Sequence, residues 1–232
     1  MVRNWSNRSL SKERTVPEER FVETAQGPAR LVVRRGRPAR AMVVLTHGAG
    51  GGIDAPDLEL LGRTLPAAGF STVLVELPWR VAGKRLAPRP AVIDECYLAV
   101  LNNLRMRSPL VVGGRSAGAR SACRLARGVG ASGVLALACP LQPPGKPERS
   151  RVDELTGARL PTLVVQGGRD PFGTPAEFPR GTVLHEVPYA DHRLKLPKSA
   201  PLSREQAHRD VRAAVLEWLD SAVLGAPGNH RG

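Results

Sequence analysis

Cysteine is scarce in this sequence: the chain contains only three, Cys96, Cys123 and Cys139, and they lie far apart. An odd number at such spacing argues against a framework of disulfides as the basis of the fold. The sequence also lacks Cys-x-x-Cys pairs and clusters of cysteine with histidine, which are the usual pattern of a zinc site. We therefore expect a hydrophobic core to hold the chain together, with neither metal nor cofactor.

Long apolar runs are missing as well. No stretch approaches the roughly 18 consecutive apolar residues that a membrane-spanning helix needs. The N-terminal segment MVRNWSNRSLSKERTVPEER has no apolar centre of the kind found in signal peptides. These absences predict a protein without a membrane span and with a cytoplasmic location.

Acidic residues are outnumbered, 21 against 34 basic ones, which gives a formal net charge of +13. Residues 1–40 carry ten Lys or Arg and four Asp or Glu, so nearly half of the excess lies there. A basic arm can contact nucleic acid or acidic surfaces, but a solvated tail is the more common explanation of such a segment. Because the sequence has no interleaved aromatics and no zinc-finger or RNA-binding signature, we expect no nucleic-acid partner.

The sequence does contain a series of short apolar runs that alternate with helix-like segments. Runs that are apolar throughout are typical of strands buried on both faces of a parallel sheet. The predicted strands are 21–24, 29–34, 41–46, 71–77, 110–112, 133–138, 161–166 and 182–187, and the main predicted helices are 56–70, 91–104 and 203–224. The alternation predicts an α/β fold with a mostly parallel sheet of about seven or eight strands, flanked by helices. We expect one domain over 19–224, a disordered basic arm over 1–18 and a flexible tail over 225–232.

Residues 110–125, LVVGGRSAGARSACRL, combine a buried strand, a glycine break and the start of a helix. Gly114, Ser116 and Gly118 form a G-x-S-x-G pattern, which in many hydrolases places a nucleophilic serine on a sharp turn between strand and helix. The glycines let the two elements approach closely. The alternative is a glycine-rich turn whose serine only caps the helix.

A second glycine-rich loop, HGAGGG, follows the predicted strand 41–46. It lacks the third glycine of a dinucleotide-binding loop and the lysine of a P-loop. Bare backbone N–H groups at the end of a buried strand favour an oxyanion hole instead, although a plain connecting loop remains an alternative. We expect the N–H groups of Ala49 and Ala117 to bind the oxyanion. The residues expected to shape the site are His47, Gly48, Gly50, Gly114 and Gly118.

A nucleophilic serine needs a base, and the base needs a carboxylate that holds its tautomer. Asp170 follows the predicted strand 161–166 and His192 follows the strand 182–187, so the chain order is Ser, Asp, His. Asp191 is the alternative acid, but it adjoins His192 along the backbone. The other histidines have weaker positions: His185 inside a strand, His208 inside a helix, His230 in the tail and His47 before the serine. We predict Ser116, Asp170 and His192 as a catalytic triad.

Four segments, HGAGGG, GGRSAGAR, VVQGGRDPFG and ADHRLKLPK, together resemble the dienelactone-hydrolase-like α/β-hydrolases over roughly residues 20–222. With the stretch CPLQPPGKP, they are most similar to the branch of Tex30-type proteins and of the hydrolase-like subunit of the nonspecific-lethal chromatin complex. The resemblance implies an α/β-hydrolase fold with an intact triad. Dienelactone hydrolases themselves have a cysteine where this chain has Ser116, so their substrate does not carry over.

The sequence thus predicts a serine hydrolase that cleaves a small carboxylic ester or thioester through an acyl-enzyme. The segment between the strand 133–138 and Asp170 is too short for a large lid domain, so we expect a pocket open to small-molecule esters. The alternative is a catalytically weak or inactive binding or scaffold protein on the same fold, because the branch includes binding subunits and fold does not imply function. Neither the acyl and leaving groups nor the oligomeric state follows from the residues.

Overall fold

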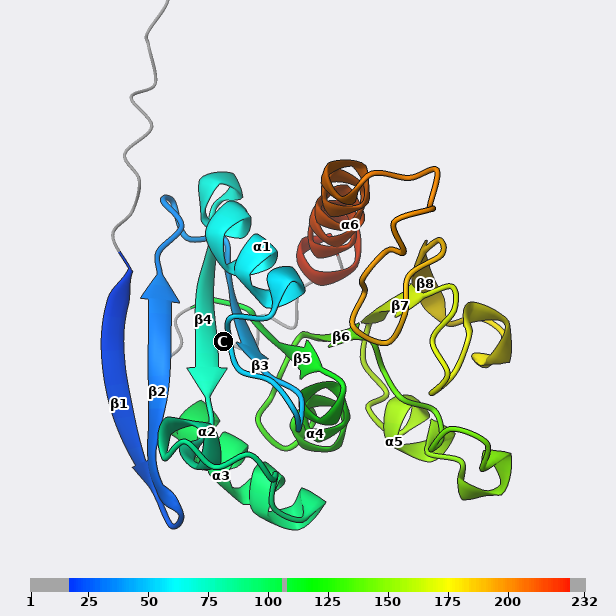
Figure 1. Ribbon diagram of the computed structural model, residues 1–232. Helices are drawn as coiled ribbons and strands as arrows, with labels where there is room; N and C mark the ends of the chain where they lie inside the picture. Colours follow the sequence, from blue (N-terminus) through cyan, green and yellow to red (C-terminus); the bar gives the residue numbers. More distant parts are fainter. Residues whose placement is uncertain (1–16, 106–107, 226–232) are drawn as a thin grey trace, which may run out of the picture.

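Across the residues that the structure describes, 17–105 and 108–225, the computed structural model has an eight-stranded sheet in the order β1-β2-β4-β3-β5-β6-β7-β8 (Figure 1). β1 and β2 form an antiparallel hairpin and β2 is antiparallel to β4, whereas all pairs from β4 to β8 are parallel. The strands are β1 Glu18–Thr24, β2 Gly27–Arg34, β3 Ala41–Thr46, β4 Phe70–Glu76, β5 Leu110–Arg115, β6 Gly133–Leu137, β7 Thr162–Gly167 and β8 Val183–Val187. The predicted mostly parallel sheet is confirmed.

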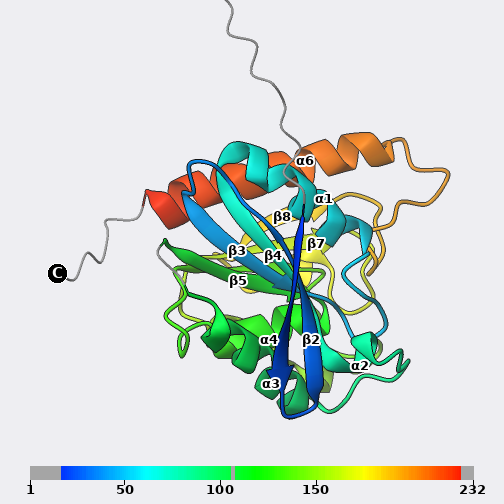
Figure 2. The ribbon, with the colours of Figure 1, turned by 90° about the vertical axis from the view of Figure 1, so that its left-hand side faces the viewer.

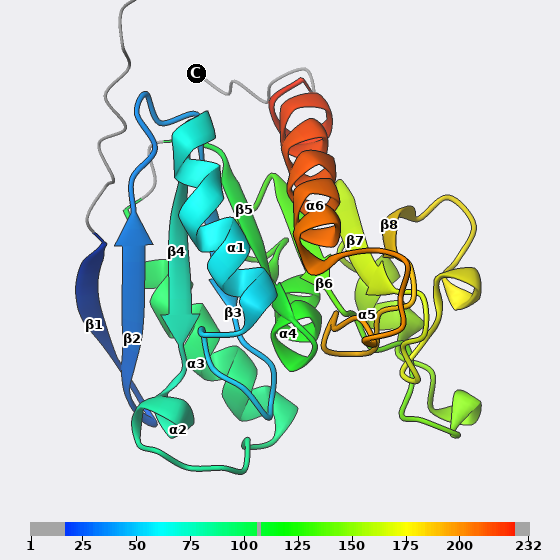
Figure 3. The same cartoon turned by 45° about the horizontal axis from the view of Figure 1, so that its top comes forward.

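Helices cover both faces of this sheet. α1 and α6 lie side by side on one face, and α3 and α4 cover the other (Figures 2 and 3). The helices are α1 Pro56–Thr64, α2 Pro78–Val81, α3 Pro90–Asn103, α4 Ala117–Leu125, α5 Val152–Thr156 and α6 Arg204–Trp218. In the part of the chain that the structure describes, no helix is both long enough and apolar enough to cross a membrane.

The central strands are apolar throughout because each of them contributes to two hydrophobic cores. In β3, Val44 packs into the core under α3 and α4, whereas Val43 and Leu45 pack into the core under α1 and α6. A strand buried on both faces therefore loses the alternation of polar and apolar residues. β8 lies at the edge of the sheet, and its Val183 is 55% exposed.

Two predicted helices differ from the observed ones. The segment 56–70 is not one helix: α1 ends at Thr64, a 3₁₀ turn covers Leu65–Ala68, and Phe70 already belongs to β4. Pro66 explains the break, because a proline has no N–H to continue the α-helical bonding and its ring clashes with the preceding turn. The segment 203–224 is α6 followed by a π-helical turn over Leu219–Leu224. Ser203 caps the start of α6, since its Oγ accepts a hydrogen bond from the Gln206 N–H at 3.1 Å.

The expected arm and tail lie almost wholly outside the described residues. Of the predicted arm 1–18, only residues 17 and 18 are described, and Glu18 already begins β1. Of the predicted tail, only Gly225 is described.

Tyr97 of α3 ties together the two strands that carry the glycine-rich loops. Its fully buried hydroxyl lies 2.8 Å from the carbonyl oxygen of Val44 in β3 and 3.0 Å from that of Gly113 in β5. Burial raises the pKa of this phenol. The hydroxyl is therefore a neutral donor to backbone oxygens that have no access to water.

Replacing Tyr97 by Phe should lower the free energy of unfolding by about 1–2 kcal/mol, because buried carbonyls lose a donor. Tyr189→Phe is the matched control, since Tyr189 is 46% exposed, and it should change the value by less than about 0.5 kcal/mol. Urea denaturation of both variants measures the difference. Equal losses in the two variants would contradict the assigned role.

Candidate active site

Ser116 stands at the turn between β5 and α4, with φ 53° and ψ −111°. A residue with a side chain rarely adopts this conformation, and neighbouring structure must hold it. The Ser116 N–H donates to the carbonyl of Leu137 in β6 at 2.9 Å, and its carbonyl accepts from the Arg120 N–H at 3.1 Å. The serine side chain makes no capping bond to α4. The turn is therefore a strained elbow that presents the hydroxyl, and the capping alternative is wrong.

Close packing against the end of β3 explains both glycines of the motif. A Cβ at Gly118 would lie 2.7 Å from the carbonyl oxygen of His47, and a Cβ at Gly114 would lie 2.5 Å from the carbonyl oxygen of Thr46, the last residue of β3. On the other side of the serine, a Cβ at Gly48 would lie 3.3 Å from the Cβ of Ser116. Ser116 is thus held directly beside the glycine-rich loop 47–52.

The fold brings Ser116, His192 and Asp170 together from the ends of three strands. Ser116 Oγ lies 2.9 Å from His192 Nε2, and His192 Nδ1 lies 2.7 Å from Asp170 Oδ2. Because an ionised carboxylate can only accept, the imidazole carries its proton on Nδ1 and leaves Nε2 as the acceptor for the serine hydroxyl. This arrangement allows the histidine to remove the serine proton.

Two residues that the sequence did not single out hold Asp170 and His192 in place. The Gln166 side chain donates to Asp170 Oδ2 at 2.8 Å, and the Phe172 N–H donates to Oδ1 at 2.8 Å. The Phe172 ring lies against the His192 ring with centroids 4.2 Å apart. A polar glutamine at the end of the apolar strand β7 was the one sequence signal for this support.

Asp191, the alternative acid, has a different role. Its Oδ1 accepts from the N–H groups of Arg193 at 2.8 Å and Lys195 at 3.0 Å, so the side chain closes the turn that follows His192. His185 lies in β8 and His208 in α6, as predicted. His230 lies outside the described residues.

His47 is buried and organises the start of the glycine-rich loop. The Leu77 N–H donates to His47 Nε2 at 3.0 Å, so Nδ1 must carry the proton that is shared with the Gly48 carbonyl at 2.8 Å. Burial lowers the pKa of His47, opposed by the Gly48 hydrogen bond. The neutral ring therefore holds the start of the loop through its hydrogen bonds with Gly48 and Leu77.

The two expected oxyanion donors are the backbone N–H groups of Ala117 and Ala49. Ala117 is the first residue of α4, where a backbone N–H has no partner within the helix. Ala49 lies in the turn that the Gly51 N–H closes by donating to the Gly48 carbonyl at 3.4 Å. In the described parts of the chain, no group of three or more His, Cys, Asp or Glu side chains is arranged to hold a metal ion.

Arg115, which precedes the serine, links the elbow to the base. Its Nε donates to Asp57 Oδ2 at 3.0 Å, and its Nη2 donates to the backbone carbonyl of His192 at 2.6 Å. Asp57 is buried in the first turn of α1; burial raises the pKa of its carboxyl, opposed by Arg115. Nothing local in the sequence signals this connection, because the three residues are joined only by the fold.

A comparison with protein families identifies the class of protein to which this chain belongs. The model described as the alpha/beta hydrolase domain matches residues 39–220, so the chain belongs to the alpha/beta hydrolase domain family. The predicted α/β-hydrolase fold is confirmed, and the family supports a hydrolase.

Solved structures share this fold at low sequence identity. An α/β serine hydrolase without a lid from Xanthomonas campestris is 16% identical, with 92% of this chain and 96% of that chain covered and a TM-score of 0.67. A dienelactone hydrolase from Anabaena variabilis is 18% identical, with coverages of 90% and 99% and a TM-score of 0.67. Est1E from Butyrivibrio proteoclasticus is 12% identical, with coverages of 87% and 99% and a TM-score of 0.65. These neighbours agree with the dienelactone-hydrolase-like resemblance at the level of the fold.

The His47 ring should stay neutral, with its proton on Nδ1, when the pH falls below about 6.5, the ordinary value for histidine. The unfolded chain then binds more protons than the folded one, so this residue's contribution to stability is present above that pH and is lost as the pH falls further. Imidazole ¹⁵N NMR of the folded protein at pH 6.0 measures the protonation state of the His47 ring, and the urea-unfolded chain is the control. A doubly protonated His47 ring at that pH would contradict the assignment.

Proposed function

We propose that this protein is a serine hydrolase that cleaves a small carboxylic ester or thioester through a Ser-His-Asp triad. The observation that carries the proposal is the continuous chain of hydrogen bonds from Ser116 through His192 to the buried Asp170. A serine hydroxyl becomes an effective nucleophile only beside such a base. Family membership supports the same class of reaction.

In the proposed reaction, Ser116 Oγ attacks the substrate carbonyl carbon while His192 Nε2 takes the hydroxyl proton. Asp170 stabilises the imidazolium that forms. The N–H groups of Ala49 and Ala117 stabilise the negative oxygen of the tetrahedral intermediate. His192 then returns the proton to the departing alcohol or thiol, which leaves acyl-Ser116. A water molecule, deprotonated by His192, releases the carboxylic acid and restores the serine.

The segment between β6 and β7 is too short to contain a lid domain, and this favours small substrates. Between β6 and β7 the described chain contains only a 3₁₀ turn over Pro147–Arg149 and the five-residue helix α5. The structural neighbour from Xanthomonas campestris is likewise described as a serine hydrolase without a lid. An open site favours short or accessible esters.

We also propose a family branch, a cellular location and a domain arrangement for this protein. The motifs support membership of the Tex30-type branch. We further propose a cytoplasmic location and no nucleic-acid partner. The basic arm 1–18 and the tail 225–232 are proposed to flank one catalytic domain over 19–224.

A fluorophosphonate probe should label the wild-type protein, and Ser116→Ala should abolish the labelling because the probe needs an activated serine. Ser121→Ala is the matched control on α4, since this buried hydroxyl has no hydrogen-bond partner in the structure, and labelling should persist. Gel fluorescence and mass spectrometry of the modified peptide measure the result. An unlabelled but folded wild-type protein would favour the binding or scaffold alternative.

Asp170→Asn should lower kcat/KM for a short-chain nitrophenyl ester by at least about a hundredfold, because the imidazole loses the partner that holds its tautomer. Asp191→Asn should stay within about twofold of wild type, since the amide retains the acceptor oxygen that its own turn requires. Similar losses in both variants would argue against Asp170 as the partner of His192.

A further inference from the structure

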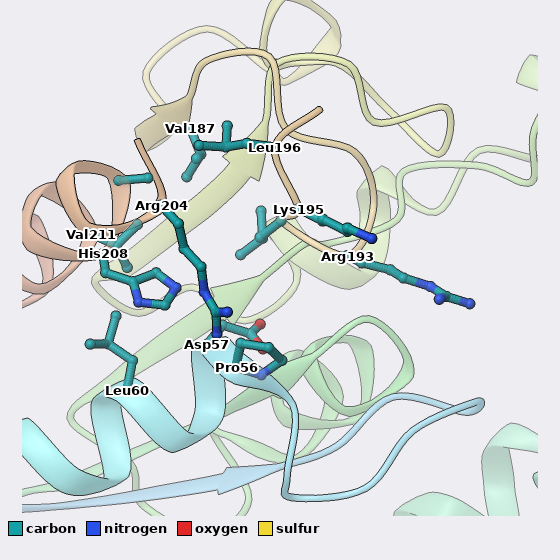
Figure 4. A pocket seen from close by; sticks show the side chains of 12 residues that line it. Pro56, Asp57, Leu60, Val187, Arg193, Lys195, Leu196, Arg204, His208 and Val211 are labelled. Atoms are coloured by element: carbon teal, nitrogen blue, oxygen red, sulfur yellow. The ribbon is translucent and has the colours of Figure 1, made fainter. Parts of the chain in front are cut away.

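A second feature lies beside the proposed catalytic residues without including any of them. A cavity of about 440 Å³ lies between α1, α6, the end of β8 and the segment 193–196 (Figure 4). This volume is in the range of small-molecule sites. Ser116, Asp170 and His192 are absent from its lining. The cavity is therefore separate from the place where an acyl group would be attached.

The floor of the cavity is apolar. Leu60 of α1, Val187 of β8 and Val211 of α6 form it together with Leu194 and Leu196. Val187 and Val211 are buried, whereas the three leucines are only half-buried. Part of this leucine surface is thus open to a ligand, and covering it would be favourable.

The mouth of the cavity is positively charged. Figure 4 shows Arg204 extending across the cavity toward Asp57, whereas the side chains of Arg193 and Lys195 extend away from the cavity. Among the described residues, none of these three cations has a carboxylate oxygen within 4 Å. The one acid in the lining, Asp57, is already paired with Arg115. Arg204 extends over an apolar cavity without a carboxylate partner, and Arg193 and Lys195 lie at the outer edge of the lining. This arrangement matches a ligand with a negative head.

We propose that this cavity binds an amphipathic anion, with a medium-length hydrocarbon tail against the apolar residues and a carboxylate or phosphate head near Arg204. The site stands independently of the proposed hydrolysis, since it does not require Ser116 to react. Its occupant would nevertheless contact two parts of the chain that are linked to His192. One is the segment 193–196 that directly follows this histidine, and the other is Asp57, whose carboxylate orients Arg115.

Isothermal titration of the full-length protein with hexanoate, octanoate, octyl phosphate and octanol tests the proposal. The anions should bind, with affinity rising about fourfold per added methylene until the cavity is filled. Octanol should bind at least about tenfold more weakly than octanoate, because it lacks the charge. The comparison of octanoate with octyl phosphate distinguishes a carboxylate head from a phosphate head.

Substitutions inside and outside the cavity lining test where octanoate binds. Arg204→Gln should weaken octanoate binding about three- to tenfold, whereas Arg209→Gln, on the same helix but outside the lining, should leave it within about twofold. Leu60→Trp should fill the apolar part of the cavity and remove the rise in affinity with the chain length of the ligand. Ser116→Ala should bind octanoate as the wild type does, which separates this site from product bound at the elbow whether or not the chain is a hydrolase.

Four results would overturn the proposal. They are no binding of the anions at millimolar concentration, equal affinity for octanol, equal losses in Arg204→Gln and Arg209→Gln, and loss of binding in Ser116→Ala. Thermal melting of each variant with and without octanoate verifies folding, since a ligand that binds the native state raises the midpoint.

Discussion

The site depends on the close approach of the elbow to the end of β3, where no side chain fits between the two backbones. Glycine at positions 114 and 118 permits this approach, and glycine at position 48 lets the loop 47–52 reach Ser116. The same packing brings the start of α4 and the loop 47–52 next to Ser116. A stable scaffold is needed to hold the serine at φ 53°, and the flanking strands β3 and β6, buried on both faces, supply it.

His192 is held at three points by different parts of the fold. Asp170 accepts from its Nδ1, the Phe172 ring lies against its ring, and Arg115 donates to its backbone carbonyl. This redundancy matters because the histidine lies after the last strand, in a segment without regular secondary structure. Arg115 joins it to the residue next to the nucleophile, so the base and the serine are fixed relative to each other rather than to the sheet alone.

Much of this architecture is predictable because the signals are local. Apolar runs such as 41–46 and 133–138 predict buried strands, and the glycine spacing around Ser116 predicts the elbow. The chain order of Ser116, Asp170 and His192 indicates their convergence, since parallel strands bring their carboxyl ends to one edge. The predicted helix over 56–70 is too long. Its apolar spacing continues past Pro66 as far as Phe70, but Phe70 is the first residue of β4.

By itself, the sequence determined the class of fold, the elbow and the residues able to form a triad, because these depend on the identity and spacing of neighbouring residues. Only the tertiary structure decided that His192 pairs with Asp170 rather than with the adjacent Asp191, whose oxygen is occupied by its own turn. It also decided the pairing of Arg115 with Asp57 and the cationic mouth of the cavity. These contacts join segments that are distant along the chain, and side-chain geometry across such distances is set by packing, which no local pattern encodes.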